Sequence, residues 1–414
     1  MADEPIIRSL LDTDEYIFPM AYIAWKYYRD VPVRYAFKNR TVKVVLPEFI
    51  DENELRAELN YVCSLHFTPD ELLYRRKNPH IPKNLSSDDI FFNFLGQLRL
   101  SPLEIVNEGS FYRIEVPGST KWPEGIFWEI FILSIVSELY FRGLIRKRDF
   151  SLSLLQKEGE RRLREKIAIL KRNPRVKIIE FATRRRAFRE WQERVAELLL
   201  EEVPNQLLGI SNVGLARKFG IRSIGTFAHQ MYMVLSGVYH GNDQEIQKSH
   251  NKVLQLWWQE YGEPLSIALT DTYGTDFFFR DFTDEQARSW RGLRQDSGDP
   301  LVFGERAIEF YTKKEIDPKT KTIVFSDGLD IKTILELQDH FQDKINIVFG
   351  WGTNLTNDLG LDPLSLVVKP VEACGHGLVK LSDNFSKAIG NPENIERFKK
   401  IFGYTGTFDE PCRY

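Results

Sequence analysis

The sequence has few cysteines, almost no excess charge of either sign and no long apolar run. Its three cysteines, Cys63, Cys374 and Cys412, are far apart and show no Cys-x-x-Cys spacing. This argues against a disulfide framework or a zinc site and indicates a reducing compartment. Lys and Arg number 56 against 59 Asp and Glu, a net charge of −3. A dedicated nucleic-acid-binding protein needs a basic excess to contact phosphates, so that class is disfavoured.

Signals for export, membrane insertion and P-loop nucleotide binding are also missing. The first five residues are Met-Ala-Asp-Glu-Pro, with acids where a secretory signal carries basic residues. The most apolar stretch, residues 126–139, is too short to span a bilayer and contains Glu129 and Glu138, so it predicts a buried helix. No GxxxxGK[S/T] motif occurs, which excludes a P-loop NTPase. We expect a cytoplasmic protein, with the nucleus left open as a second compartment, that binds neither membrane nor nucleic acid.

The remaining composition is that of a globular protein, with 43% hydrophobic and 28% charged residues. A length of 414 residues predicts two or three domains. We divide the chain into an α+β N-terminal domain that contributes a segment to the substrate site, a charged helical connector, a (β/α) barrel domain and a C-terminal tail packed on the N-terminal domain. These parts span residues 1–140, 141–174, 175–390 and 391–414, respectively.

Inside the N-terminal domain, residues 31–37 and 41–46 predict two strands joined by a Lys-Asn-Arg turn. Residues 52–65 have helical spacing, and residues 103–116 predict a pair of strands. The connector interleaves Lys and Arg with Glu. This pattern favours a solvated helix with i,i+4 ion pairs over a basic face for nucleic acid.

From about residue 175 the pattern becomes a repeated unit, in which a short apolar run ends in polar or glycine residues and a helical segment follows. Continuous apolar runs are typical of parallel strands buried on both faces. Eight such strands most simply close into an irregular TIM-like (β/α) barrel, whose active sites lie at the carboxyl ends of the strands. The eight runs are residues 176–181, 206–210, 223–226, 265–270, 290–294, 322–325, 345–349 and 364–368.

Acidic, basic and glycine residues gather directly after these runs. A single Asp after a strand is usually a helix cap, but three Asp, two Arg and one His at one rim together predict a site. They are Asp271, Asp296, Asp327, Arg184, Arg294 and His229. The Gly350-Trp351-Gly352 run favours backbone contact with an anion, since the third glycine of a dinucleotide fingerprint is replaced by Leu355. Asp271 is expected to orient the His229 imidazole so that one ring nitrogen is free to react.

Taken in order, these motifs resemble the nicotinate phosphoribosyltransferase family over nearly the whole chain. The most specific are Arg-Gln-Asp-Ser-Gly-Asp-Pro at 294–300 and Gly-Trp-Gly-Thr-Asn at 350–354. The others are residues 10–16, 128–130, 181–186, 209–212, 225–229, 268–272, 325–327 and 380–383.

The resemblance implies a reaction that joins nicotinate to phosphoribosyl pyrophosphate with Mg²⁺, giving nicotinate mononucleotide and pyrophosphate. ATP would be a co-substrate through a phosphorylated histidine, and homodimers would share active sites. It implies His229, Asp271 and Arg294 as catalytic residues. Substrate contacts would come from Tyr16 (supplied by the partner subunit), Phe181, Arg184, Ser211, Asp296, Asp327, Gly350, Gly352 and Thr353. The residues that bind the metal are left unassigned.

The chain departs from the family pattern near the expected site. Ala182 and Ile210 replace a glycine and a threonine, Gln230 replaces the glutamate after the histidine, and residues 17–19 lack the usual lysine and threonine. The alternatives are therefore a divergent enzyme that uses another aromatic acid or no ATP, and a non-catalytic relative that binds nucleotide or nicotinate. A nucleic-acid-binding protein is the remaining alternative.

Overall fold

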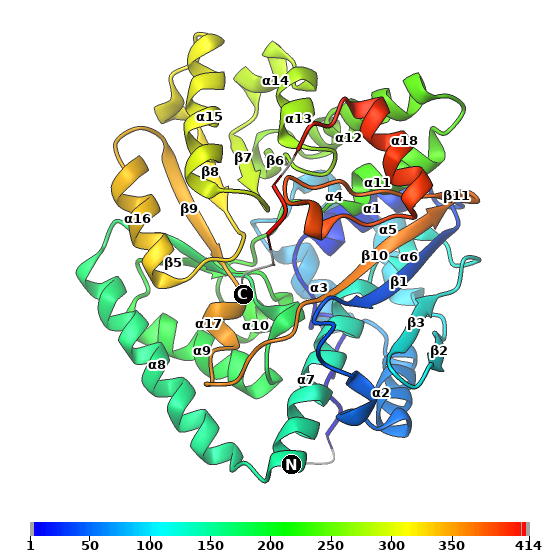
Figure 1. Ribbon diagram of the computed structural model, residues 1–414, viewed down its shortest axis with the longest axis vertical. Coiled ribbons are helices and arrows are strands. Elements are labelled where there is room, and N and C mark those ends of the chain that lie inside the picture. The colour runs from blue at the N-terminus through cyan, green and yellow to red at the C-terminus, as the bar shows by residue number, and fades with distance from the viewer. Residues whose placement is uncertain (1–3, 407, 411–414) are drawn as a thin grey trace.

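The computed structural model describes residues 4–406 and 408–410, which form two β-sheets and the helices around them (Figure 1). The first sheet is antiparallel, with the strand order β11-β10-β1-β3-β2. Its strands are β1 (Val33–Asn39), β2 (Glu104–Asn107), β3 (Tyr112–Val116), β10 (Leu366–Ala373) and β11 (His376–Gly377). The N-terminal domain therefore exists as predicted, but two strands from near the C-terminus complete its sheet.

The second sheet is parallel, with the order β5-β4-β9-β8-β7-β6. Its strands are β4 (Ile178–Glu180), β5 (Leu207–Ile210), β6 (Ile267–Leu269), β7 (Gly292–Gln295), β8 (Thr322–Phe325) and β9 (Asn346–Trp351). Six of the eight predicted runs are thus strands of one parallel sheet, and most of their residues are buried, as continuous apolar runs predict.

Two predicted barrel strands are wrong. Residues 223–226 form only a single bridge, between Ser223 and Ile210, and residues 364–368 lead into β10, which pairs antiparallel with β1. Within the residues that the structure describes, no ladder joins the Ser223 segment to β6, so the parallel strands form an open sheet. A buried apolar run has the same pattern in either sheet, which is why the last run could not be assigned from its sequence.

The helices cover both sheets. Their bounds are α1 (Ile17–Tyr27), α2 (Glu52–Ser64), α3 (Pro69–Lys77), α4 (Lys83–Ser86), α5 (Asp89–Gln97), α6 (Trp122–Gly125), α7 (Trp128–Arg148), α8 (Leu152–Arg172), α9 (Arg189–Glu202), α10 (Val213–Phe219), α11 (Gln230–Val238), α12 (Asp243–Tyr261), α13 (Thr275–Asp281), α14 (Asp284–Ser289), α15 (Pro300–Lys313), α16 (Ile331–Phe341), α17 (Thr353–Thr356) and α18 (Pro392–Phe402).

Helix α7 is the buried helix that the apolar stretch predicted, and it packs against β10. None of the helices in the described part of the chain is both long enough and apolar enough to cross a membrane. The predicted second strand at residues 41–46 is wrong: this segment is a turn followed by a short 3₁₀-helix. Cys63 and Cys374 are free thiols, and Cys412 lies outside the described residues.

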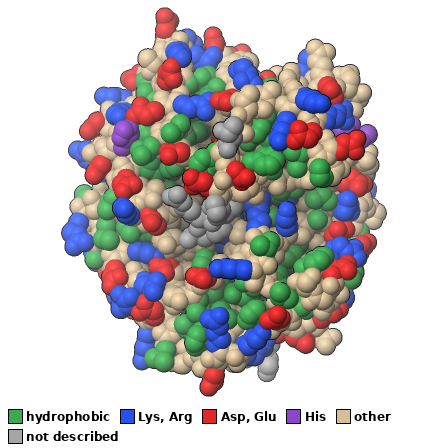
Figure 2. Space-filling model, in the orientation of Figure 1, with side chains coloured by type: hydrophobic (Ala, Val, Ile, Leu, Met, Phe, Trp, Pro, Cys, Tyr) green, Lys and Arg blue, Asp and Glu red, His purple; other side chains and the backbone are tan. Residues whose placement is uncertain are grey.

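The charged connector is helical as predicted, but it is divided. Helix α7 ends at Asp149, whose left-handed backbone (φ 50°) turns the chain into α8. Ion pairs at i,i+4 spacing run along α8, among them Arg161–Glu165 and Arg164–Glu160. On the face seen in Figure 2, positive and negative side chains alternate, and no broad basic patch appears.

The described part of the C-terminal tail contacts both the first sheet, through Asn394 of α18 and Gly377 of β11, and the helices of the second domain. Helix α18 lies beside α12 (Figure 1). The ring of Phe402 stacks on that of Tyr273, with centroids 3.9 Å apart. The tail carries an apolar face of Phe398, Ile401 and Phe402, and the aromatic cluster of the second domain buries that face.

Candidate active site

A cavity of about 100 Å³ opens at the carboxyl ends of the parallel strands, where barrel-like folds place their chemistry. Its lining includes every predicted site residue except Asp271. They are Tyr16, Phe181, Arg184, Ser211, His229, Arg294, Asp296, Asp327, Gly350, Gly352 and Thr353. We call this the front cavity.

An acidic segment at residues 12–15 fixes the N-terminal wall of the front cavity. Asp12 accepts two hydrogen bonds from buried Arg186, at 2.7 and 2.8 Å. Glu15 does the same with buried Arg75, at 2.6 and 3.0 Å. Asp14 accepts a hydrogen bond from the Ser211 hydroxyl at 2.7 Å. Ser211, which the sequence predicted to contact substrate, is therefore bonded to this segment. Bidentate arginine–carboxylate pairs are directional, so they hold the segment in one register.

Tyr16 follows this segment and lines the front cavity of its own chain. The prediction that a partner subunit supplies Tyr16 is therefore wrong. Its backbone lies against Gly225, where an added Cβ would stand 2.5 Å from the Tyr16 nitrogen. The Tyr16 backbone can approach this closely only because residue 225 is a glycine. The sequence could not reveal this, since the spacing of motifs does not say which chain brings them together.

Phe181 forms the opposite apolar wall. Its ring packs on Gly350, where a Cβ would meet the ring at 2.7 Å. Gly350 therefore makes room for the ring, which is a second use of a residue predicted only for anion binding. Ala182 adopts φ −101° and ψ −4°, values open to any residue, so the lost glycine causes no backbone strain. Ile210 packs on Ala196 and Leu215, away from the front cavity.

Arg294 is the most unusual charge in the front cavity. Its side chain is buried, with 8% exposed, yet it forms no ion pair and its Nε has no hydrogen-bond partner among the described residues. Within the same described residues, the buried Tyr16 hydroxyl also has no hydrogen-bond partner. An unpaired buried guanidinium is costly, and the cost is recovered when an anion binds it. Arg184, across the same cavity, lies 3.7 Å from Glu129.

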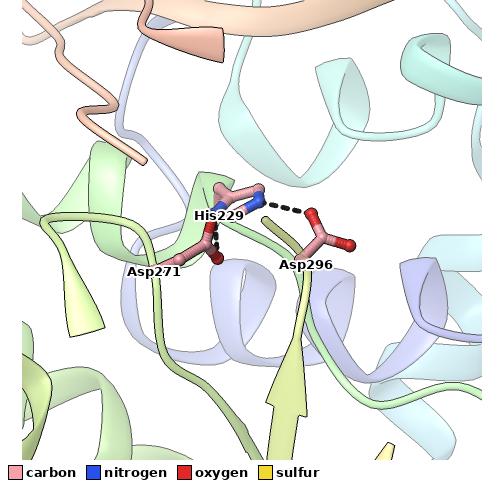
Figure 3. Close-up of side chains that lie close together, drawn as sticks. All are labelled: His229, Asp271 and Asp296. Carbon is pink, nitrogen blue, oxygen red and sulfur yellow. Dashed lines mark hydrogen bonds and ion pairs between the residues drawn. The ribbon is translucent and has the colours of Figure 1, made fainter. Parts of the chain in front are cut away.

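The His229 imidazole lies between the segments that follow β6 and β7 (Figure 3). Its Nε2 is 3.0 Å from Asp296 Oδ2, and its Nδ1 is 2.9 Å from the Thr272 hydroxyl. Burial, with a smaller contribution from nearby Lys380, lowers the His229 pKa from 6.5 to about 4. The ring is therefore neutral near pH 7. Because ionised Asp296 can only accept, Nε2 carries the proton and Nδ1 accepts from Thr272.

Asp271 lies behind the histidine rather than in the cavity. Its Oδ1 is 3.8 Å from His229 Nδ1 and has no hydrogen-bond partner among the described residues. Its Oδ2 accepts from Ser297 and Ser382. Thr272, which sequence reasoning did not single out, is the direct Nδ1 partner. At 3.8 Å Asp271 Oδ1 is beyond hydrogen-bond range of Nδ1, so Asp271 acts on the imidazole through its charge.

The other two acids of the rim differ in their electrostatics. Burial raises the Asp296 pKa, but the hydrogen bond to His229 and the charge of Arg294 outweigh it and hold that pKa well below 3.8. Asp327 pairs with Lys387, but burial still raises its pKa. Burial lowers the pKa of Lys380, opposed by Asp271, from 10.5 to about 8.

The sequence did not identify a second buried cluster on the same cavity. Glu129 of α7 accepts hydrogen bonds from Lys369 of β10 and from Gln230, the latter at 3.2 Å. Tyr35 donates to the Gln230 oxygen at 2.9 Å. The Gln230 side chain thus contacts Glu129 and Tyr35, not the imidazole that precedes it. The sequence signal for this cluster was the presence of two acids within the apolar run at residues 126–139.

His229, Asp271 and Asp296 place one potential ligand atom each within 4.8 Å of one another. Mg²⁺ prefers oxygen ligands, so the two carboxylates fit this ion and the imidazole does not. The unpartnered Asp271 Oδ1 is consistent with a carboxylate that still has a ligand position to give.

Comparison with known proteins agrees with the motif pattern. Residues 176–406 match the model of the nicotinate phosphoribosyltransferase (NAPRTase) family, and residues 11–137 match the NAPRTase N-terminal domain. The crystal structure of a nicotinate phosphoribosyltransferase from Porphyromonas gingivalis is 31% identical, with a TM-score of 0.83 over 96% of this chain and 100% of its own. One from Vibrio cholerae is also 31% identical, with a TM-score of 0.85 over 97% of this chain and 95% of its own.

Proposed function

The chain belongs to the nicotinate phosphoribosyltransferase family, and from this premise we propose which of its residues carry out the reaction. The enzyme joins nicotinate to the C1 carbon of phosphoribosyl pyrophosphate and releases pyrophosphate. The product, nicotinate mononucleotide, leads toward NAD.

Arg294 is the main binding residue that we assign to nicotinate, the acceptor. We assign the nicotinate carboxylate to its unpaired guanidinium, with Arg184 as the second cation of that wall. Tyr16 and Phe181 line the same cavity and would hold the flat ring between them. Ser211 would act indirectly, because its hydrogen bond to Asp14 holds the segment that leads to Tyr16.

The donor would occupy the rest of the front cavity. Asp296 and Asp327 are placed to accept from ribose hydroxyls, and the backbone at Gly350, Gly352 and Thr353 would meet the 5′-phosphate. Loss of pyrophosphate leaves an oxocarbenium-like ribose beside the Asp296 carboxylate, whose low pKa keeps it charged to stabilise that cation. The pyridine nitrogen attacks without losing a proton, so the transfer needs no general base.

Mg²⁺ would be held by Asp296 and Asp271 together with the donor's phosphates, and it would neutralise charge that develops on the leaving group. Lys380 and Lys387 line the same region and would add fixed positive charge there.

ATP coupling through His229 is the second half of the proposal. For Nε2 to attack the terminal phosphorus of ATP, its proton must first move to Nδ1, where the charge of Asp271, 3.8 Å away, would stabilise it. ADP would leave, and the phosphorylated ring would sit beside the donor's pyrophosphate site. Asp271 therefore acts by positioning the imidazole rather than by touching substrate.

One chain contributes both proposed aromatic walls, so we propose that the acceptor ring is held within a single subunit. We keep the homodimer as a proposal, to be tested by sedimentation of the purified protein at assay concentrations.

The decisive experiment is a product assay with nicotinate, phosphoribosyl pyrophosphate and Mg²⁺, with and without ATP, beside parallel assays with nicotinamide and with quinolinate. We expect nicotinate mononucleotide, stimulation by ATP, and loss of turnover in Arg294→Ala. Product from another acid in preference to nicotinate would overturn the acceptor assignment. Tight binding of nicotinate without any product would indicate a binding protein instead.

A further inference from the structure

A second cavity lies at the opposite, amino-terminal end of the parallel sheet. It measures about 150 Å³ and reaches the surface. Its walls are apolar side chains from four strands, Ile179 of β4, Ile267 of β6, Val324 of β8 and Val348 of β9. We call this the rear cavity. Small barrels and curved sheets normally fill this volume with side chains, so the empty space is unexpected.

The two cavities meet at the acceptor site. Phe181, Gly225 and Arg294 line both the front and the rear cavity. One face of the Phe181 side chain therefore borders the proposed nicotinate position, and another borders the rear volume. A molecule in the rear cavity would rest against the same ring and the same guanidinium that hold the acceptor.

Charge at the rear mouth indicates what could enter. Arg222 and Arg291 both line this cavity, and Arg222 has no ion-pair partner among the described residues. The Arg222 pKa is lowered, by burial and then by the charge of Arg291, so the two cations repel each other with little compensation. The acids nearby compensate them only in part: Glu15 is paired with Arg75, and Glu263 forms a solvent-exposed ion pair with Arg291 at 3.6 Å. An anion at this mouth would relieve the repulsion.

Volume and polarity together define the ligand. An apolar cavity of about 150 Å³ is large enough for a molecule the size of benzene. The cationic mouth adds the requirement for one negative group at the outer end.

We propose that the rear cavity binds a second small organic monoanion, a ring-sized apolar carboxylate. Its carboxylate lies at Arg222 and Arg291, and its ring lies inside, behind Phe181. The inference rests on the proposed function only in placing nicotinate on the front side of Phe181. Since the rear ligand fills the volume behind that ring, it couples to acceptor binding and lowers the acceptor KM about fivefold or more.

The test uses the full-length enzyme and a fluorinated benzoate as the probe, followed by fluorine NMR. The front cavity is first filled with nicotinate mononucleotide and pyrophosphate, whose binding is titrated separately. We expect saturable binding of one equivalent of probe. Binding should weaken at least tenfold in the double variant Arg222→Glu, Arg291→Glu, which changes only exposed residues, and in Val348→Trp, which fills the volume. Leu154→Trp, on the exposed face of α8, is the matched control and should bind as the wild type does.

No saturable probe binding with the front cavity filled would overturn the proposal, as would equal affinity in all four proteins. If Val348→Trp fails to fold, the arginine variant decides. A failure of the front-site assignment appears in the separate mononucleotide titration and leaves the benzoate result to decide the rear site.

Discussion

Two regions of the molecule bury arginines in opposite ways. In the segment at residues 12–15, Arg186 and Arg75 each meet a carboxylate with two hydrogen bonds. In the front cavity, Arg294 is also buried, but it has no such partner among the described residues. The paired arginines hold the chain in place, whereas the unpaired one has its binding capacity left for a ligand. Burial alone does not separate these roles, but the presence of a partner does.

The largest expected effect follows from breaking a paired arginine. Arg186→Met removes the bidentate partner of buried Asp12 and leaves it only Arg189, at 3.4 Å, and the Asn212 hydrogen bond, which should cost about 3 kcal/mol of unfolding free energy. The measurement is chemical denaturation of both proteins. Arg161→Met, which removes an exposed pair on α8, is the control and should change stability by less than about 0.5 kcal/mol. Equal small losses in both variants would contradict the anchoring role.

The unpaired arginine should show the reverse pattern. Arg294→Ala removes no internal ion pair, so we expect the folded state to be unharmed. The acceptor KM should rise with a loss of about 2–5 kcal/mol of binding, which is roughly 30- to 4,000-fold. Steady-state kinetics with nicotinate as the varied substrate measures this, and thermal unfolding measures the stability. A destabilised variant with an unchanged KM would place Arg294 among the structural arginines.

Burial also determines the charge of His229, because it lowers the pKa of the imidazole. Its folded pKa, about 4, lies below the ordinary 6.5, so folding favours the neutral ring. Its contribution to stability is complete above pH 6.5 and is lost as the pH falls through 4. His229→Asn should therefore flatten the stability profile between these values and abolish ATP hydrolysis coupled to product. Full ATP stimulation in this variant would contradict the assigned role.

A smaller effect is expected at Gln230, a buried neutral amide that contacts the cavity-lining Glu129. Gln230→Glu would put a second carboxylate about as close to Glu129 as the present 3.2 Å contact, and two such acids cannot both ionise freely. We expect substrate KM values to become pH-dependent, changing by about tenfold. Gln230→Met, which removes the hydrogen bonds but adds no charge, should shift KM equally at every pH. A pH-independent Gln230→Glu variant would show that the Glu129 cluster does not act on substrate.

The last prediction is that mixing two impaired variants restores no activity. Since Tyr16 and Phe181 line the cavity of one chain, mixing Tyr16→Ala with Phe181→Ala should restore no activity. Each variant alone should raise the acceptor KM. Recovery in a verified mixed dimer would show that the two walls come from different chains.

The sequence predicted which residues gather at the rim better than it predicted the architecture of the sheet. His229, Arg294, Asp296 and Asp327 were found because charged residues directly after apolar runs are uncommon and specific. Six strands were found for the same reason. Strand β10 was assigned to the wrong sheet, because burial on both faces looks alike in parallel and antiparallel surroundings.

Contacts between distant segments were beyond the sequence pattern. Thr272 rather than Asp271 bonds His229 directly, and Gln230 turns from the imidazole toward Glu129. Both depend on side-chain directions of a few ångströms, which no spacing rule encodes. The pairing of residues 12–15 with Arg75 and Arg186 also lay outside reach, since an arginine on a helix or loop looks solvated until its partner is known.

The anchoring of residues 12–15 has a consequence for the order of synthesis. Glu15 accepts a hydrogen bond from Ser223, 208 positions later, and Asp12 waits for Arg186, 174 positions later. Ribosomes add about 5–20 residues per second, so the segment that seats Tyr16 emerges roughly 10 to 40 seconds before its last partner exists. Arg75 is made only 60 positions after Glu15, but the contacts of Asp12 with Arg186 and of Glu15 with Ser223 must wait, and Tyr16 stays unplaced until then. The segment that carries Tyr16 is therefore synthesised early but is among the last parts of the active site to reach its folded position.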